Sequence, residues 1–228
     1  MSLSSLLETS KIELNAEQIS QLERYGDLLI EWNEKFNLTA ITEKEEIYVK
    51  HFLDCLILTN YQLSGKLADV GTGAGFPAIV LKIACPQLSI TMLEPNNKKI
   101  SFLNEVIRQL DLKDIVAVNQ RSEDYAREHY EEFDFVTSRA VASLNILSEL
   151  CLPLLKVHGH FLAMKGPRGQ EELEQAAKGI ARLSGVVLNV DSYQLADQQQ
   201  RLVIDLTKDQ PTSRKYPRNY SQIKKKPL

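Results

Sequence analysis

The stretch Leu67-Ala-Asp-Val-Gly-Thr-Gly-Ala-Gly-Phe-Pro77 decides how the rest of the chain is interpreted. It begins as a short apolar strand with one acid, Asp69, passes through three closely spaced glycines, and leads into an apolar helical run, 79–84. Glycine lets the backbone turn at positive φ and leaves no Cβ between the main chain and a ligand. The free N–H groups at the start of a helix would face that ligand. The stretch therefore predicts a loop that binds a nucleotide-like cofactor.

The spacing of Gly71, Gly73 and Gly75 discriminates between nucleotide cofactors. The dinucleotide fingerprint is G-x-G-x-x-G, and here the third glycine comes one residue early, which disfavours a nicotinamide dehydrogenase. An acid at Asp69 suits a cationic ligand better than a phosphate. Glu94 ends the next expected strand, where a carboxylate can accept hydrogen bonds from ribose hydroxyls. A glycine turn that serves packing alone is the alternative.

From residue 67 onward, short β-rich runs alternate with helical segments, which is typical of a parallel sheet with crossover helices. The expected strands are 67–70, 88–93, 115–118, 133–137, 160–164, 186–190 and 202–206. The expected helices between them are 76–84, 98–110, 123–130, 144–155 and 170–183. A short polar join precedes the last strand, so we expect the last two strands to pair antiparallel. The sequence predicts an α/β fold with a mostly parallel sheet.

Two helices are expected ahead of this sheet. Asn15 and Gln18 form a capping-box pattern for a helix over 15–35, and Thr42 with Glu45 forms a second such pattern. These helices cannot supply strands, so we expect them to pack beside the sheet as a cap and to wall a substrate cleft. The expected organisation is a helical extension over 1–62, a cofactor-binding domain over 63–210 and a basic tail over 211–228.

The composition excludes several classes of protein. The chain has 228 residues, a formal net charge of −3 and 43% hydrophobic residues, and no apolar run approaches the ~20 residues that cross a bilayer. The first ten residues lack the pattern of a secretory signal. Three scattered cysteines predict reduced thiols in a cytoplasmic protein. His158 and His160 could share a strand face, but no third ligand is near, so no metal site is expected.

Charge is unevenly distributed along the chain. Six of the 27 basic residues and none of the 30 acidic ones lie in 211–228. A basic tail on an acidic body indicates a local contact with a polyanion. A solvated, disordered end that aids solubility is the competing interpretation, and charge alone does not choose.

The acid-and-glycine loop together with Glu94 resembles the S-adenosylmethionine (SAM) site of Rossmann-like methyltransferases. The resemblance then narrows to the GidB/RsmG family, because further blocks along nearly the whole chain are similar to that family. These blocks are Asn37-Leu-Thr-Ala-Ile41, His51-Phe-Leu-Asp54, Asp69–Pro77, Glu94 with Lys98-Lys99 and Phe102-Leu103, Thr137-Ser-Arg-Ala140, Lys165-Gly166, Tyr216-Pro-Arg218 and Lys225-Lys-Pro-Leu228. The family methylates N7 of one guanine in bacterial 16S rRNA, with SAM as the methyl donor and a class I methyltransferase fold.

The resemblance also implies roles for individual residues. The implied SAM-binding residues are Asp69, Gly71, Gly73, Gly75, Phe76, Glu94, Ser122, Glu123 and Arg139. Arg139 stands at the methyl-transfer edge, where its fork of donors would hold O6 of the guanine, a phosphate or the SAM carboxylate. The implied RNA contacts are Lys165, Arg218, Lys224, Lys225 and Lys226. The expected partner is 16S rRNA or the small ribosomal subunit, bound by a monomer.

The absence of two catalytic motifs is consistent with methylation at guanine N7. Guanine N7 has a lone pair and no proton, so its methylation requires alignment of the reactants and no general base. No Asn-Pro-Pro-Tyr follows the fourth expected strand, and no Pro-Cys nucleophile is present. His51 and Asp54 fall on one helical face and are expected to be a structural pair more than a substrate contact. Two alternatives stay open: a SAM-dependent methyltransferase of another RNA, a protein or a small molecule, and a non-catalytic SAM- or RNA-binding module.

Overall fold

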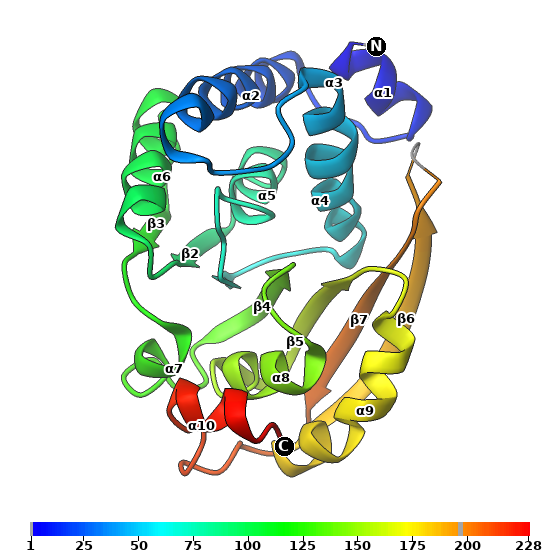
Figure 1. Cartoon of the computed structure of the whole chain (residues 1–228). Helices are drawn as coiled ribbons and strands as arrows, with labels where there is room; N and C mark the ends of the chain where they lie inside the picture. Colours follow the sequence, from blue (N-terminus) through cyan, green and yellow to red (C-terminus); the bar gives the residue numbers. More distant parts are fainter. Residues whose placement is uncertain (1, 196–197) are drawn as a thin grey trace.

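The computed structural model describes residues 2–195 and 198–228, and a seven-stranded sheet runs through its middle (Figure 1). The strand order is β3-β2-β1-β4-β5-β7-β6. The strands are β1 (Lys66–Val70), β2 (Ser89–Leu93), β3 (Ile115–Val118), β4 (Phe133–Arg139), β5 (Leu155–Lys165), β6 (Gly185–Gln194) and β7 (Gln200–Lys208). Neighbours from β3 to β5 are parallel, whereas β7 is antiparallel to both β5 and β6. The expected α/β class and the antiparallel strand pair are confirmed.

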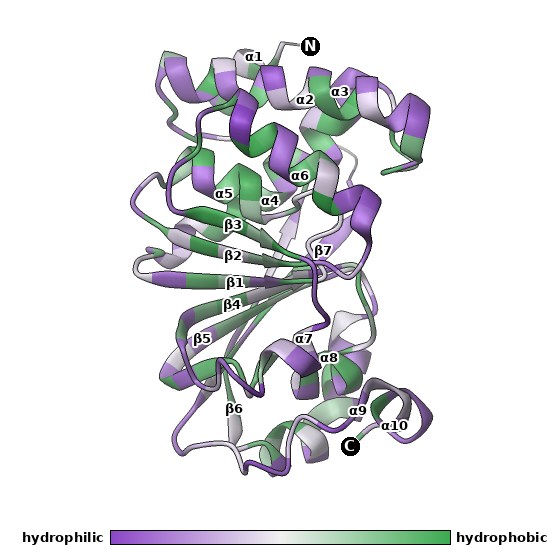
Figure 2. Cartoon of the chain, turned by 90° about the vertical axis from the view of Figure 1, so that its left-hand side faces the viewer, coloured by the Kyte–Doolittle hydropathy of each residue, from purple (hydrophilic) through white to green (hydrophobic). Residues whose placement is uncertain are grey.

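Helices cover both faces of the sheet (Figure 2). One face carries α1 (Leu3–Thr9), α2 (Ala16–Phe36), α3 (Lys44–Ile47), α4 (Asp54–Leu56), α5 (Ala78–Ala84) and α6 (Asn97–Gln109). The other face carries α7 (Ser122–Tyr125), α8 (Leu144–Cys151), α9 (Gly169–Arg182) and α10 (Tyr220–Lys225). The helices expected ahead of the sheet therefore lie against it.

The sheet separates two apolar cores because side chains alternate along each strand. Leu67 of β1 packs in the core beneath α1–α6, and its neighbour Ala68 packs in the core beneath α7–α10. In β5, Leu162 packs in the core beneath α1–α6, and its neighbour Phe161 packs in the core beneath α7–α10. Apolar residues on both faces explain why these strands are continuous hydrophobic runs in the sequence.

The start of α2 is as expected from its capping residues. The Asn15 side chain accepts a hydrogen bond from the Gln18 N–H, and the Gln18 side chain accepts one from the Asn15 N–H, both at 2.9 Å. These bonds satisfy two backbone donors at the helix start. The buried face of α2 includes Leu22, Tyr25 and Leu29.

The second expected capping box is wrong. The N-cap of α3 is Glu43, one residue after Thr42, and it makes no side-chain capping bond. An exposed 2.6 Å ion pair joins Lys44, the first residue of α3, to Asp27 of α2. The segment then continues as a π-helix, Tyr48–Leu53, through α4 and into a 3₁₀ helix, Ile57–Tyr61. A π-turn inside a helix often accompanies a functional site.

Several other boundaries differ from the expectation. β5 begins at Leu155, five residues before the expected strand, and α8 accordingly ends at Cys151. α7 ends at Tyr125 rather than at Tyr130. Residues 211–228 contain α10 and bury Tyr216 and Ile223 in the core beneath α8 and α9, so this segment packs on the body of the protein. Hydrophobic side chains within the basic tail explain that packing.

The strand order places the glycine loop at the centre of the sheet. β1 lies between β2 and β4. The chain fills one side of the sheet with β2 and β3 and then returns to the other side with β4, so the direction of the strand order changes at β1. Ligands of open parallel sheets bind at such a switch point. Within 2–195 and 198–228, no helix combines the length and apolarity needed to cross a membrane.

Candidate active site

The loop after β1 is a tight turn held by backbone hydrogen bonds to the neighbouring strand β2. The N–H groups of Gly71 and Thr72 both bind the carbonyl of Leu93, at 2.9 and 3.3 Å. Gly71 has φ 71°, and a Cβ there would lie 2.5 Å from Val141. Gly73 has φ 62°, but a Cβ there would make only ordinary contacts, with the Gly71 carbonyl oxygen and Lys99 Nζ, both at 3.9 Å. Gly71 thus permits close packing, whereas Gly73 leaves room for a ligand against the main chain.

Asp69 is fully buried beneath this loop. Its Oδ2 accepts a hydrogen bond from the N–H of Ala78, the first residue of α5, at 3.2 Å. Its Oδ1 and the hydroxyl of Thr72 have no hydrogen-bond partner among the described residues. Burial raises the pKa of Asp69 from 3.8 to about 7, although the hydrogen bond from the Ala78 N–H acts in the opposite direction. A buried carboxylate with a vacant acceptor suits a cationic ligand.

Glu94 is held beside the loop at the end of β2. Its Oε2 accepts a 3.1 Å hydrogen bond from the Gly73 N–H, and its Oε1 accepts a 2.9 Å bond from the Asn96 N–H. Lys99 lies 3.8 Å from Oε2. An ionised carboxylate has about four acceptor sites, so these contacts fix its orientation and leave capacity for hydroxyl donors.

A cavity of about 200 Å³ opens at this loop. It is lined by Leu38, Thr39, His51, Gly71, Thr72, Gly73, Ala74, Phe76, Lys99, Arg139 and Ala140. Four residues expected to bind the cofactor, Gly71, Gly73, Phe76 and Arg139, therefore lie on one cavity. Ser122 and Glu123 are buried at the start of α7, at the same edge of the sheet but outside this lining.

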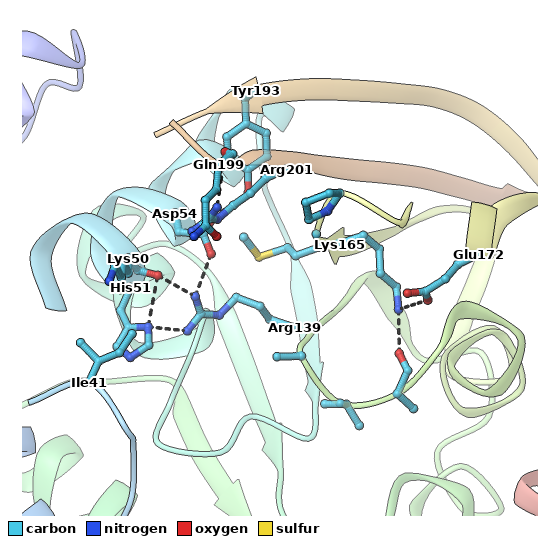
Figure 3. Close-up of a pocket in the computed structure, with 16 residues that line it drawn as sticks. Ile41, Lys50, His51, Asp54, Arg139, Lys165, Glu172, Tyr193, Gln199 and Arg201 are labelled. Carbon is cyan, nitrogen blue, oxygen red and sulfur yellow. Dashed lines mark hydrogen bonds and ion pairs between the residues drawn. The ribbon is translucent and has the colours of Figure 1, made fainter. Parts of the chain in front are cut away.

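Arg139, the last residue of β4, reaches across to the N-terminal helices (Figure 3). Its Nη1 donates to Oδ2 of Asp54 at 2.7 Å and to the carbonyl of Lys50 at 3.1 Å. Its Nη2 lies 2.9 Å from Nδ1 of His51. The guanidinium also lies over the ring of Phe76, with 5.1 Å between Cζ and the ring centroid. Four contacts fix this side chain in one orientation.

The contact with Arg139 decides the protonation of His51. A guanidinium only donates, so Nδ1 of His51 must accept, and Nε2 must carry the proton and donate to the Thr39 hydroxyl at 3.1 Å. The Lys50 carbonyl, 3.2 Å from Nδ1, then receives no hydrogen from it. Burial and the charge of Arg139 lower the pKa of His51 from 6.5 to about 3. His51 is therefore neutral at physiological pH and orients Arg139.

Asp54 joins Arg139 to the β6–β7 hairpin. Its Oδ1 accepts a 2.8 Å hydrogen bond from the Tyr193 hydroxyl and lies 3.2 Å from Nε of Arg201. The Asp54 side chain is only 6% exposed and each arginine side chain is 15% exposed, so the charges meet largely out of water. One buried carboxylate between two arginines leaves a net positive charge.

A second, larger cavity of about 630 Å³ adjoins the first (Figure 3). It is lined by Ile41, Lys50, His51, Asp54, Arg139, Ala140, Val141, Ala142, Met164, Lys165, Gly166, Pro167, Glu172, Tyr193, Gln199 and Arg201. His51, Arg139 and Ala140 line both cavities. Among the described residues, the larger lining has four lysine or arginine side chains and two carboxylates. It is a positively charged hollow beside the glycine loop.

The residues predicted to contact RNA lie in two places. Lys165 lines the larger cavity, where its Nζ donates to the Ala142 carbonyl at 2.7 Å and pairs with Glu172 at 2.9 Å. Arg218 lies away from it and makes a bidentate pair with Glu149, whose side chain is fully buried. Lys224, Lys225 and Lys226, in and just after α10, are exposed to solvent.

Sequence reasoning missed several residues of the larger cavity. His51 and Asp54 had a signal, since their spacing puts both on one helical face, but Arg139 as their shared partner was not foreseen. Tyr193 and Arg201 gave no signal, because the fold of the terminal hairpin alone brings them to Asp54. His160 pairs with Asp205 at 3.0 Å, and no group of three metal-ligating side chains occurs within the described ranges.

The sequence matches a known family over most of its length. Residues 18–203 match the GidB family model, described as rRNA small subunit methyltransferase G. A protein of that name from Staphylococcus saprophyticus is 46% identical, across 99% of this chain and 97% of the relative. Another from a Geobacillus species is 43% identical, across 98% of this chain and 97% of the relative.

Solved structures resemble the fold at low sequence identity. A precorrin-6y C5,15-methyltransferase from Geobacter metallireducens has a TM-score of 0.54 and 15% identity, covering 74% of this chain and 90% of that one. The TYW2 protein of M. jannaschii, solved in complex with AdoMet, has a TM-score of 0.51 and 17% identity, covering 66% and 74%. Both likenesses concern the fold alone.

Proposed function

The chain belongs to the GidB family of rRNA small subunit methyltransferases, and on that premise we propose how its residues carry out the family's reaction, the methylation of guanine N7 in 16S rRNA. The observation that carries the proposal is the position of Arg139. This side chain lines both the cavity at the glycine loop and the larger positive cavity beside it. We assign the first cavity to SAM and the second to the guanine and its flanking phosphates.

The residues around the loop fit SAM. Gly73 lines the cavity with no Cβ between its main chain and a ligand, and Glu94 has carboxylate lone pairs free for ribose hydroxyls. The Oδ1 of buried Asp69 has no hydrogen-bond partner among the described residues, and a nearby cationic group of the cofactor would favour the ionised form of this carboxyl. Ser122 and Glu123, buried beyond the end of β3, are assigned to the adenine. When bound, SAM supplies an electrophilic methyl group on a sulfonium.

The reaction requires alignment more than proton transfer. Guanine N7 presents a lone pair and has no proton to lose, so no general base is needed, and alignment can contribute roughly 7 kcal/mol or more. Arg139 has the donors to hold guanine O6, which neighbours N7 on the same base edge. Its contacts with Asp54, His51 and Lys50 keep it in place before substrate binds. His51 stays neutral and takes no part as an acid.

Cations at the larger cavity and on the tail are assigned to rRNA phosphates. Lys165 lies within the cavity, and Lys224–Lys226 are exposed on the packed tail. Phosphate contacts contribute affinity and orientation rather than base selection. Arg218 shares this assignment, but its bond to buried Glu149 gives it a further role, because it anchors the tail that carries the lysines.

We propose that a cytoplasmic monomer suffices for this activity. Its support is that one chain provides every assigned residue of both cavities. The extension over 1–62 supplies His51 and Asp54, so we regard it as part of the site rather than as a separate unit, beside a core over 63–210 and the tail over 211–228.

The test is methyl transfer from labelled SAM to substrates that lack the modification. Naked 16S rRNA, small subunits and total cellular protein are incubated separately with the enzyme. We expect label in the 16S rRNA of at least one of the two RNA substrates. Label in protein or small molecules alone would contradict the rRNA assignment, and SAM binding without transfer to any substrate would indicate a non-catalytic module.

A further inference from the structure

Helix α2 makes side-chain hydrogen bonds to both ends of the segment that follows β1, which consists of the glycine loop and α5. At one end, the hydroxyl of Tyr25 donates a 2.6 Å hydrogen bond to the carbonyl of Ala74, inside the glycine loop. At the other end, the side-chain amide of Gln18 donates to the carbonyls of Ile83 and Ala84, at 2.9 and 3.0 Å. These two carbonyls end α5, where the helix has no N–H donors of its own for them. α2 therefore braces the whole segment from the loop to the end of α5.

The Tyr25 hydroxyl has no access to water. Tyr25 is fully buried, and its ring packs 5.4 Å from the rings of both Phe52 and Phe76. Burial raises the pKa of Tyr25 well above 10, so the hydroxyl keeps its proton and remains a donor. A polar atom in such surroundings is costly unless it is bonded, and the Ala74 carbonyl satisfies it. The bond therefore persists whenever the loop has the described conformation.

The contact bears directly on the cofactor cavity. Ala74 lines the cavity at the glycine loop, between Gly73 and Gly75. A Cβ on Gly75 would lie 2.9 Å from the Tyr25 hydroxyl, so the loop fits closely around that oxygen. Phe76 beneath the Arg139 guanidinium also packs on the Tyr25 ring. One side chain from the N-terminal extension thus touches the loop and the residue that supports Arg139.

We infer that Tyr25 is a positioning residue for SAM, which it affects by holding the Ala74 carbonyl and with it the shape of the loop. The inference rests on the proposed function, because it takes the cavity at the glycine loop as the SAM site. A preformed loop lowers the ordering cost of binding. Without the hydroxyl, the loop can sample other turns before SAM binds, while the aromatic packing is kept.

The test is Tyr25→Phe, which removes one oxygen atom. We expect the dissociation constant for SAM, measured by calorimetry, and KM for SAM to rise about 3- to 10-fold, as for the loss of one hydrogen bond. We expect kcat at saturating SAM and RNA to change less than about twofold. Tyr48→Phe is the matched control, because Tyr48 is also buried and packs on Phe52, but its hydroxyl interacts with Lys44 and not with the loop.

The outcomes of this test distinguish the inference about Tyr25 from the proposed function. Equal SAM affinity of wild type and Tyr25→Phe, with or without a lower melting temperature, would show a purely structural tyrosine and overturn the inference alone. A comparable loss of SAM affinity in Tyr48→Phe would also overturn it, because the effect would then come from general loosening of the aromatic cluster. Failure of the wild-type protein to bind SAM would overturn the proposed function as well.

Discussion

Arg139 and Asp54 form a 2.7 Å ion pair between the end of the central sheet and the N-terminal helices. Asp54 also binds Arg201 and Tyr193 of the terminal hairpin, so three distant parts of the chain meet at one carboxylate. Breaking a buried pair from one side typically costs about 3–5 kcal/mol, since the remaining charge is uncompensated. The arrangement keeps the two cavities in a fixed relation.

Arg139→Lys tests the role of the fixed guanidinium. Lysine keeps the positive charge but cannot donate to Asp54, Lys50 and His51 with one planar group. We expect kcat for RNA methylation to fall about 10- to 100-fold, as for the loss of charged hydrogen bonds, with SAM affinity nearly unchanged. Arg108→Lys is the control, because Arg108 pairs with Glu105 on the exposed side of α6. If Arg139→Lys weakened SAM binding and left kcat intact, Arg139 would serve the cofactor instead.

Gly71→Ala tests whether the loop is built around a missing Cβ. The new methyl group would lie 2.5 Å from Val141 at a backbone φ of 71°. We expect the free energy of unfolding to drop by roughly 1–3 kcal/mol and SAM affinity to weaken with it. Gly166→Ala is the matched control, since a Cβ there has no neighbour within 4 Å. Indistinguishable denaturation curves and SAM affinities for the two variants would refute the strained-loop description.

The raised pKa of Asp69 predicts a pH dependence of stability. Between about pH 3.8 and 7 the folded protein holds a proton on Asp69 that the unfolded chain has lost, so folding loses stability as pH rises through this window. Burial lowers the pKa of His51, which makes stability rise with pH instead. His51 is the same in the wild type and in Asp69→Asn, so its contribution cancels when the two proteins are compared. We expect the wild type to lose stability relative to Asp69→Asn from pH 4.5 to 7.5 in denaturant titrations. If the free energies of unfolding of the two proteins changed in parallel with pH, the raised pKa of Asp69 would be contradicted.

Replacing Lys224, Lys225 and Lys226 together by glutamine tests the tail. Fewer phosphate contacts should weaken RNA binding and flatten its dependence on salt, with the log–log slope reduced by up to about three units, while SAM affinity stays the same. A triple glutamine variant at Lys11, Lys66 and Lys113 is the control, because these lysines are also exposed and lie outside the tail. An unchanged salt slope in the tail variant would remove these residues from the RNA interface.

The sheet and the cofactor loop were predictable because their signals are local. The run from Leu67 to Pro77 carries the strand and the turn residues and leads directly into the helix, which begins at Ala78, two residues later than expected. Glu94 directly follows β2, a place that strand periodicity predicts. The strand order then brings these residues to one edge of the sheet without further information.

The substrate side was less predictable because it depends on distant contacts. Nothing near Asp54 in the sequence indicates that Arg139 and Arg201 will both bind it. The Thr42 capping box is wrong because α3 begins one residue later, with Glu43 as an N-cap that makes no side-chain bond. Arg218 looked like a free cation, yet its partner Glu149 is buried on a helix 69 residues away. For Asp54 and Arg218, the charged partner lies far away in the sequence, so the local pattern gives no sign of it.

The position of the transferred methyl group tests the central claim most directly. Unmodified 16S rRNA or small subunits are treated with enzyme and SAM, and N7-methylguanine is then mapped by chemical strand cleavage. The proposed geometry predicts one cleavage site, at one guanine, that requires both enzyme and SAM. Methylation of an exocyclic amine or a ribose, cleavage at many guanines, or no enzyme-dependent cleavage would contradict it.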